Sequence, residues 1–383
     1  MVEAVRRGKS LAKVAKKFHA AKSTVEFWVK RAEGKRLDRV DWNDRPDGPN
    51  TPKNRVSVQI EQCVLNLRKE LKENSSLGEY GADAIGREME RLGCIHPISR
   101  PTINRILQRN GMLDGTRRQR RKAPPTGWYL PEVANGSAEL DQFDFVEDLC
   151  LEGGRIFHVL NGISLHGGLV VSWPISQMRA ENTVQNMISF WKEFGLPNCV
   201  QFDNSTIFQG SRKPDSLGRV SRLCLSLGVV PVFVPPQETG FQASIESYNG
   251  RWQRGVFRRF YFENLSDVKR QSSKYVTATR AKNASRRDAS PDRWEFPNDY
   301  ELDYQKHPTG TVIFIRRTNA VGHADVLGHQ WKLPRIGPHR LVRAEGDLTE
   351  NEISFYRLRR RDPEDQECLG GTEYHFPKRV FKE

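Results

Sequence analysis

The apolar positions in the first part of the chain recur with the period of a helix. In residues 10–18 they fall at i, i+3, i+4 and i+7, which is one face of a short amphipathic helix. A second helix is predicted over residues 23–35, where Ser23 as N-cap and Glu26 form a capping box. Two helices joined by a tight turn, the second carrying basic residues, are the plan of a helix-turn-helix DNA reader. We therefore predict such a module over residues 1–40.

A second helical region follows a loop rich in Asp, Asn and Pro. Helical periodicity is present in three segments, residues 56–71, 80–93 and 99–113. The third segment begins with Ser99 as N-cap and has Pro101 in its first turn, where the missing N–H of proline costs nothing. The pattern predicts a second helix-turn-helix module over residues 55–115.

Beyond Glu139 the chain alternates between strand and helix patterns. Strands are predicted over residues 143–149, 155–163, 167–175, 199–203 and 229–236. Helical patterns lie between or after them, over residues 181–195, 219–228 and 241–257. Three antiparallel-like strands followed by alternating helix and strand predict an α/β core with a mixed five-stranded sheet over residues 135–262.

The C-terminal part is predicted to hold two further regions and a tail. Residues 263–306 are polar and basic, which predicts a connecting segment that is helical in part. Short strand patterns over residues 307–362 predict a small β-barrel studded with Arg and Lys, followed by a tail over residues 363–383. The resulting fold class is multidomain, with all-α modules, a central α/β core and a small β module.

The chain carries a strong excess of positive charge. Lys and Arg number 61 against 47 Asp and Glu, a formal net charge of +14, which favours a polyanionic partner such as DNA. Part of this charge lies in a basic linker predicted over residues 116–134. Two interpretations of the linker stay open, contact with DNA phosphates or plain solvation, and its basic residues include Arg117, Arg118, Arg120 and Arg121.

The cysteines and the apolar stretches point to a cytoplasmic protein. The six cysteines are scattered and have no zinc-ligand spacing. The N-terminus lacks an apolar signal core, and the most apolar stretch, residues 223–236, is too short to span a bilayer. We expect no membrane partner and no small-molecule cofactor.

Three acidic residues lie where the predicted core would bring them together. Asp144 is on the first strand, Asp203 ends the fourth strand, and Glu246 is near the start of the last helix. Carboxylates without nearby His or Cys form an all-oxygen site of the kind that Mg²⁺ or Mn²⁺ prefers. Two such ions about 3.5–4 Å apart can activate a nucleophile and stabilise the leaving oxygen of a phosphodiester.

The first and the third carboxylate of this set each have alternative candidates nearby in the sequence. Asp141 and Asp148 flank Asp144 and are expected to be surface charges, whereas Asp144 stands between two phenylalanines on the strand. Glu238 is a weaker rival to Glu246, because it lies in a Pro- and Gly-rich loop rather than on a helix. An aspartate after a strand is also commonly a turn or cap residue.

The motifs DFVEDL, QFDN and IESYNGRW, in this order within residues 139–260, resemble the catalytic core of DDE transposases and retroviral-type integrases, which has an RNase H-like fold. The lack of a His/Cys zinc module favours a bacterial insertion-sequence transposase over a virus-like integrase. Many relatives have Asp-Asp before the Ser of the second strand, where this chain has Asn161 and Gly162.

The resemblance implies a role for several residues. Asp144, Asp203 and Glu246 would bind two Mg²⁺ or Mn²⁺ ions. Asn204 and Asn249 would support these ligands or contact DNA, and Arg251 would contact DNA. In the first module we expect five further contacts, at base edges for Ser23, Thr24 and Glu26 and at phosphates for Lys30 and Arg31.

The function expected from these features is that of a transposase that binds the ends of a mobile element, cleaves a phosphodiester and joins the freed 3′-hydroxyl to target DNA. Holding two ends implies a homo-oligomer, and the protein would associate with the nucleoid. The alternatives are a DNA-binding regulator with an inactive recombinase fold and a stand-alone metal-dependent nuclease.

Overall fold

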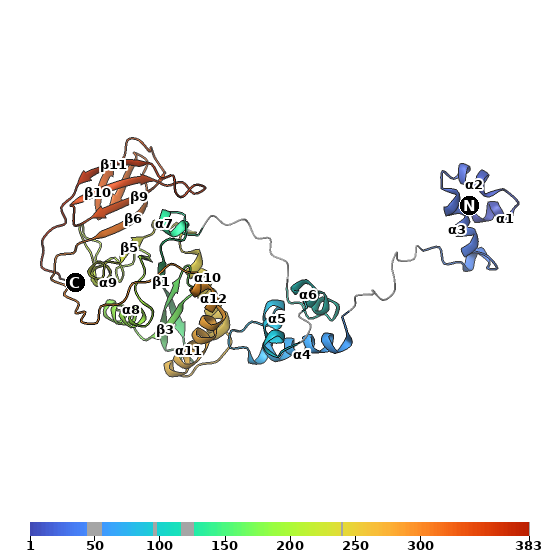
Figure 1. Ribbon diagram of the computed structural model, residues 1–383, viewed down its shortest axis with the longest axis horizontal. Helices are drawn as coiled ribbons and strands as arrows, with labels where there is room; N and C mark the ends of the chain where they lie inside the picture. The colour runs from blue at the N-terminus through green and yellow to red at the C-terminus, as the bar shows by residue number, and fades with distance from the viewer. Residues whose placement is uncertain (44–55, 95–97, 116–125, 239, 383) are drawn as a thin grey trace. The chain divides into compact units, whose positions relative to one another are not determined.

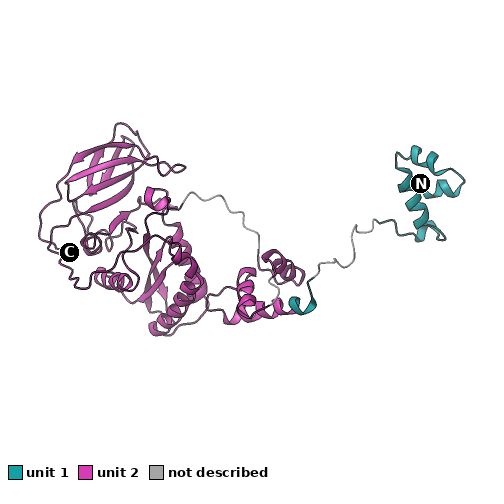
Figure 2. Cartoon of the chain, viewed as in Figure 1, with its two compact units in different colours: residues 1–61 teal, residues 62–383 magenta. Residues whose placement is uncertain are grey.

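The structure is a computed structural model that describes residues 1–43, 56–94, 98–115, 126–238 and 240–382. Its contacts divide the chain into two compact units, residues 1–61 and residues 62–383 (Figure 2). No helix within the described ranges is long and apolar enough to cross a membrane.

In the N-terminal unit, the described residues 1–43 form the helices α1 (Val2–Arg6), α2 (Leu11–Lys17) and α3 (Lys22–Arg31) and the short turn η1 (Leu37–Arg39). Val14 and Val25 are buried between α2 and α3, as the helical pattern predicts. The predicted capping box is wrong, because α3 begins at Lys22 with Ala21 in the N-cap position and no side-chain cap. Ser10 caps α2 instead, where its side chain accepts a hydrogen bond from the backbone N–H of Lys13.

The second helical region consists of α4 (Val58–Asn74), α5 (Ala82–Arg91) and α6 (Arg100–Arg109). Ser99 is at the N-cap of α6, but its hydroxyl lies 3.0 Å from that of Thr102 and caps no backbone N–H. Arg68 of α4 fastens the region, because its guanidinium lies over the ring of Tyr80 and binds Asp114 at 2.7 Å.

The central sheet contains the five predicted strands, β1 (Leu140–Cys150), β2 (Ile156–Ser164), β3 (Val170–Ile175), β4 (Cys199–Phe202) and β5 (Val230–Phe233). Strand β2 is antiparallel to β1 and β3, while β4 is parallel to β1 and β5. Helices cover both faces of this sheet (Figure 1): α8 (Ala180–Phe194) and α9 (Arg219–Ser226) pack on one, and α10 (Ala243–Trp252) and α11 (Leu265–Lys282) on the other.

The C-terminal strands extend this sheet instead of forming the predicted small β-barrel. They are β6 (Thr311–Arg317), β9 (Leu341–Asp347), β10 (Glu352–Arg357) and β11 (Cys368–Glu373). Strand β6 pairs in parallel with β5, with Val232 opposite Ile313, so nine strands form one sheet in the order β11-β10-β9-β6-β5-β4-β1-β2-β3 (Figure 1). A separate hairpin is formed by β7 (His323–Val326) and β8 (His329–Lys332).

The structure also changes the description of two other C-terminal segments. The predicted tail over residues 363–383 contains β11 and the buried side chains of Tyr374 and Phe376. Residues 263–306 are helical in part, as predicted, and their helix α11 also contacts the central sheet. Arg280 of α11 donates a 2.9 Å hydrogen bond to the carbonyl of Val170 in β3, and α12 (Ala284–Asp288) follows α11.

Candidate active site

The two aspartates of the proposed site come from neighbouring parallel strands. Asp144 lies within β1, and Asp203 directly follows Phe202, the last residue of β4. The register of the two strands sets Gln142 opposite Gln201. Two residues further along each strand, Asp144 and Asp203 therefore fall at the same level and on the same face of the sheet. Glu246 is exposed in the first turn of α10.

The electrostatics of Asp144 show that the three carboxylates interact. Burial raises the pKa of Asp144 to about 7, and the negative charge of Asp203 contributes the next largest rise. Glu246 adds a smaller rise in the same direction. A carboxyl group held among like charges in a half-buried position is a common property of catalytic and metal-binding sites.

A pair of asparagines holds Asp144 in place. Asn249, one turn after Glu246 on α10, donates a hydrogen bond from Nδ2 to Oδ2 of Asp144 at 2.8 Å. Asn161 of β2 faces Asp144 in the strand register and donates from its own Nδ2 to Oδ1 of Asn249 at 2.8 Å. Asn161 thus has a defined contact in the site although it occupies a position where many relatives of the resembled family have Asp.

Gly162 is required by packing at the second of these positions. A Cβ atom on Gly162 would lie 2.4 Å from the ring of Phe143 and 2.8 Å from the side chain of Val171. Distances this short exclude any larger side chain without movement of the core. The departure from Asp at this position therefore follows from how β1, β2 and β3 pack.

The residues around Asp203 serve the local fold. Oδ1 of Asp203 accepts a 3.0 Å hydrogen bond from the backbone N–H of Ser205, which is the turn role that an aspartate after a strand often has. Asn204 donates to the carbonyl of Val234 at 2.6 Å and accepts from the buried Arg316 of β6 at 2.9 Å. The amide of Asn204 is therefore engaged within the chain, whereas the family resemblance implied that it supports the ligands or contacts DNA.

The donor set fits a hard divalent cation, because it consists of carboxylate oxygens only. The three side chains do not converge on a common metal position in this structure. Within the described ranges, no group of three or more His, Cys, Asp or Glu is placed to hold a metal ion. Glu246 is the outlying member, being exposed at the start of its helix.

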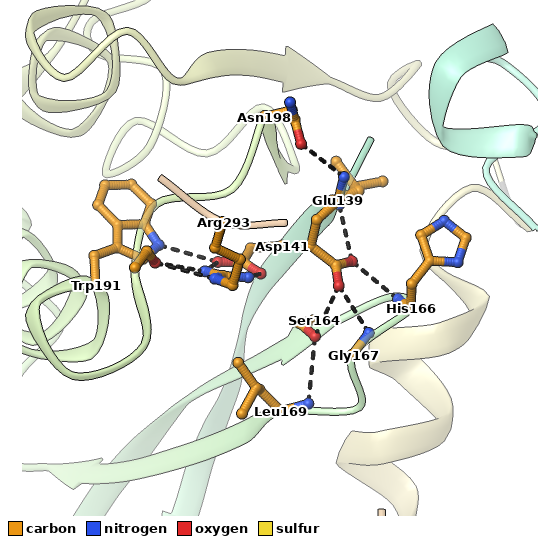
Figure 3. A network of polar contacts seen from close by, with 11 residues as sticks. Glu139, Asp141, Ser164, His166, Gly167, Leu169, Trp191, Asn198 and Arg293 are labelled. Atoms are coloured by element: carbon orange, nitrogen blue, oxygen red, sulfur yellow. Dashed lines mark hydrogen bonds and ion pairs between the residues drawn. The ribbon is translucent and has the colours of Figure 1, made fainter. Parts of the chain in front are cut away.

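The rivals of these residues have other partners. Asp141 is fully buried, against the expectation of a surface charge. Its carboxylate accepts hydrogen bonds from Trp191 at 3.0 Å and from both terminal nitrogens of Arg293 at 2.9 and 2.7 Å (Figure 3). Asp148 is exposed at a bulge of β1, as expected. Glu238 forms an ion pair with Arg317, whose Nη2 lies 2.8 Å from its Oε2.

One buried carboxylate is not indicated by the sequence pattern, that of Glu139 directly before β1. It accepts hydrogen bonds from the backbone N–H groups of His166 and Gly167 at 2.9 and 2.7 Å and lies 3.3 Å from the hydroxyl of Ser164 (Figure 3). These contacts fix the turn between β2 and β3. No local pattern signals this role, because the partners of Glu139 lie at the end of β2 and in the turn that follows it.

The proposed DNA contacts have different surroundings. Ser23, Thr24, Glu26 and Lys30 are exposed on α3, as direct contact would require. Arg31 is half-buried against the ring of Trp28 and pairs with Asp41 at 3.2 Å. Arg251 is exposed on α10. The four arginines of the linker, Arg117, Arg118, Arg120 and Arg121, lie outside the described residues.

No protein-family model matches the chain. Among solved structures, the catalytic core domain of BIV integrase is 18% identical, with 37% of this chain and 83% of that chain covered and a TM-score of 0.28. A chain of the simian T-cell lymphotropic virus intasome in complex with PP2A regulatory subunit B56 gamma is 12% identical, with 70% of this chain and 91% of that chain covered and a TM-score of 0.33. At these scores the two structures add nothing to what the strand order and the site show by themselves.

Proposed function

We propose that this protein is a DDE-type DNA transposase of the bacterial insertion-sequence kind. The observation that carries the proposal is the register that sets Asp144 and Asp203 at the same level on neighbouring parallel strands, in a mixed sheet whose first five strands have the order β3-β2-β1-β4-β5. In this function the protein would bind the ends of a mobile element, cleave a phosphodiester and join the freed 3′-hydroxyl to target DNA.

Asp144, Asp203 and Glu246 would hold two Mg²⁺ or Mn²⁺ ions, which supply activation of the attacking oxygen and stabilisation of the leaving oxygen. The raised pKa of Asp144 supports this assignment, because repulsion among three carboxylates is what a bound cation would relieve. Asn249, through its hydrogen bond to Asp144, would hold this ligand in place, and Asn161 would hold Asn249. Binding would draw the exposed side chain of Glu246 toward the two aspartates.

The charge of the chain and the N-terminal unit support DNA as the partner. The formal net charge is +14, and the exposed side of α3 presents Ser23, Thr24, Glu26 and Lys30. We propose that α3 is the recognition helix of a helix-turn-helix module and that α4 to α6 form a second one. Two element ends must be held together, so the active form would be a homo-oligomer on DNA, in the cytoplasm and at the nucleoid.

A strand-transfer assay tests the proposal. The full chain is incubated with labelled DNA taken from either side of its gene, a target plasmid and Mg²⁺ or Mn²⁺. We expect 3′-end cleavage and joined products with the unmodified chain, and neither with Asp203→Asn, which should still bind the DNA. Binding without cleavage by the unmodified chain would instead support the regulator with an inactive fold, and cleavage without joining would support the nuclease.

A further inference from the structure

A basic cavity of about 550 Å³ lies between the loop that leads into α10 and the C-terminal strands. Its aromatic side is formed by Trp128 and Phe241, whose ring centroids are 5.5 Å apart. Phe241 directly precedes Gln242, the N-cap residue of the helix that carries Glu246. The cavity therefore adjoins the segment that positions the third carboxylate of the proposed site.

Two arginines in this cavity have no acidic partner in the part of the chain that the structure describes. Of the four that line it, Arg317 pairs with Glu238, and Arg357 pairs with Glu367 at 3.2 Å. Arg340 and Arg360 are exposed and form no ion pair with any residue that the structure describes. The cavity thus keeps an uncompensated charge of two guanidinium groups, and guanidinium groups bind phosphate in a bidentate manner.

The wall of the cavity beneath Arg360 contains the ring of Trp128, which has a buried and unsatisfied donor. The guanidinium of Arg360 lies over the indole of Trp128, 5.4 Å from its centroid. Trp128 is 4% exposed, and its Nε1 is buried without a hydrogen-bond acceptor among the described residues. Arginines together with aromatic rings are the combination that binds the phosphate and the base of an unpaired nucleotide.

The size of the cavity decides which part of a DNA molecule fits. Its volume lies within the range of roughly 300–1,000 Å³ that is typical of small-ligand sites. A DNA duplex, whose bases are stacked inside, is far too wide to enter, whereas a nucleotide that has left the stack can enter such a pocket.

We infer that this cavity binds one unpaired nucleotide of the DNA on which the protein acts, with its phosphate on Arg340 and Arg360 and its base against the wall that contains Trp128 and Phe241. The inference rests on the proposed function in its choice of DNA as the ligand. It goes beyond that function because it assigns the C-terminal sheet extension a preference for DNA that is unpaired next to the cleavage site.

Binding measured without divalent metal tests the inference separately from catalysis. The probes are a fluorescein-labelled duplex with a short unpaired tail and a fully paired duplex with the same number of phosphates, both titrated with the full chain in EDTA. We expect the tailed duplex to bind about tenfold more tightly. In Arg340→Gln/Arg360→Gln this ratio should fall to about one, while the control Arg335→Gln/Arg361→Gln, which removes two exposed arginines outside the cavity, should keep the ratio.

Equal binding of the two probes by the unmodified chain would overturn the inference, as would a preference that survives the loss of Arg340 and Arg360. A second measurement avoids any effect of substitution on folding. Iodouracil placed in the unpaired tail should cross-link to Trp128 or Phe241 of the unmodified chain, and cross-links found only elsewhere would contradict the assignment. Because neither measurement needs cleavage, an inactive chain that still prefers the tail would refute the transposase and leave the nucleotide site standing.

Discussion

Asn249 donates a 2.8 Å hydrogen bond from Nδ2 to Oδ2 of Asp144. The bond ties α10, which carries Glu246, to β1, which carries the first aspartate. Oδ1 of Asn249 already accepts a hydrogen bond from Asn161, so the amide of Asn249 presents its N–H group to Asp144. A donor that faces a carboxylate favours the ionised form and opposes the effects of burial and of Asp203.

Replacement of Asn249 with Ala should raise the pKa of Asp144 above its value of about 7, because the opposing hydrogen bond is lost. Strand transfer at neutral pH should fall about tenfold or more, and its pH profile should move to higher pH. Asn161→Ala should change both quantities in the same direction and by less. Carboxyl NMR titration of the metal-free protein measures the pKa, and an unchanged midpoint in both variants would contradict the role given to this pair.

The raised pKa of Asp144 predicts how the metal-free protein responds to pH. The folded-state pKa of about 7 exceeds the ordinary value of 3.8 for an aspartate, so between these pH values the folded state binds a proton that the unfolded state has lost. The stability that Asp144 contributes is complete below about pH 4 and is lost as the pH rises through 7, by at most about 1.4 kcal/mol per pH unit. Urea unfolding in EDTA should show this loss, and Asp144→Asn should remove it. A slope that is the same in the variant would count against the assignment.

Asp203→Asn should separate stability from activity. Removing the charge that repels Asp144 should raise the free energy of unfolding of the metal-free protein near neutral pH. The same substitution should abolish strand transfer and the increase in melting temperature that we expect Mg²⁺ to give the unmodified protein. The matched control is Asp148→Asn, at an exposed bulge of β1, which should leave all three quantities unchanged. A metal-dependent increase that persists in Asp203→Asn would exclude Asp203 as a ligand.

Asp141 and Arg293 form a buried ion pair, and their substitutions should affect stability in a way that depends on both partners. Arg293→Met leaves the carboxylate of Asp141 buried and unpaired, which should cost about 3–5 kcal/mol in the free energy of unfolding. Adding Asp141→Asn to Arg293→Met should recover part of this cost. The double variant should keep metal-dependent cleavage. A double variant that is folded but inactive would instead support Asp141 as a metal ligand.

The sequence predicted the parts of the fold that leave a local pattern. Each strand from β1 to β5 is marked by apolar runs or alternation, and Asp203 is marked by the change from Phe202 to polar residues. The surroundings of Asp141 left no such mark, since its partner Arg293 lies 152 residues further along the chain. The start of α3 at Lys22 also differed from the predicted cap at Ser23.

The extension of the sheet was missed for a related reason. Parallel pairing of β5 with β6 depends on backbone hydrogen bonds between segments far apart in sequence, and either strand would look the same in a separate barrel. Strand β11 has the sequence CLGGTE, in which two glycines conceal the strand pattern. The basic cavity was missed because its arginines come from β6, β10 and the loops beside them.

Arg316 connects this extension to the proposed site and offers a test of whether the two act together. It is 7% exposed and donates to the carbonyls of Val234 and Asp325 at 3.2 and 3.0 Å, and its bond to Asn204 holds the residue next to Asp203. Burial lowers the pKa of Arg316 to about 10, so the side chain stays charged at neutral pH.

Arg316→Met should lower the free energy of unfolding by about 3 kcal/mol or more, because several buried acceptors lose their donor together. Arg317→Met is the control on the same strand, where a partly exposed ion pair with Glu238 is lost, and it should cost less than about 1 kcal/mol. Where Arg316→Met remains folded, strand transfer should fall while DNA binding is kept, because Asn204 no longer fixes the turn of Asp203. Full activity in the folded variant would show that the C-terminal strands do not position the site.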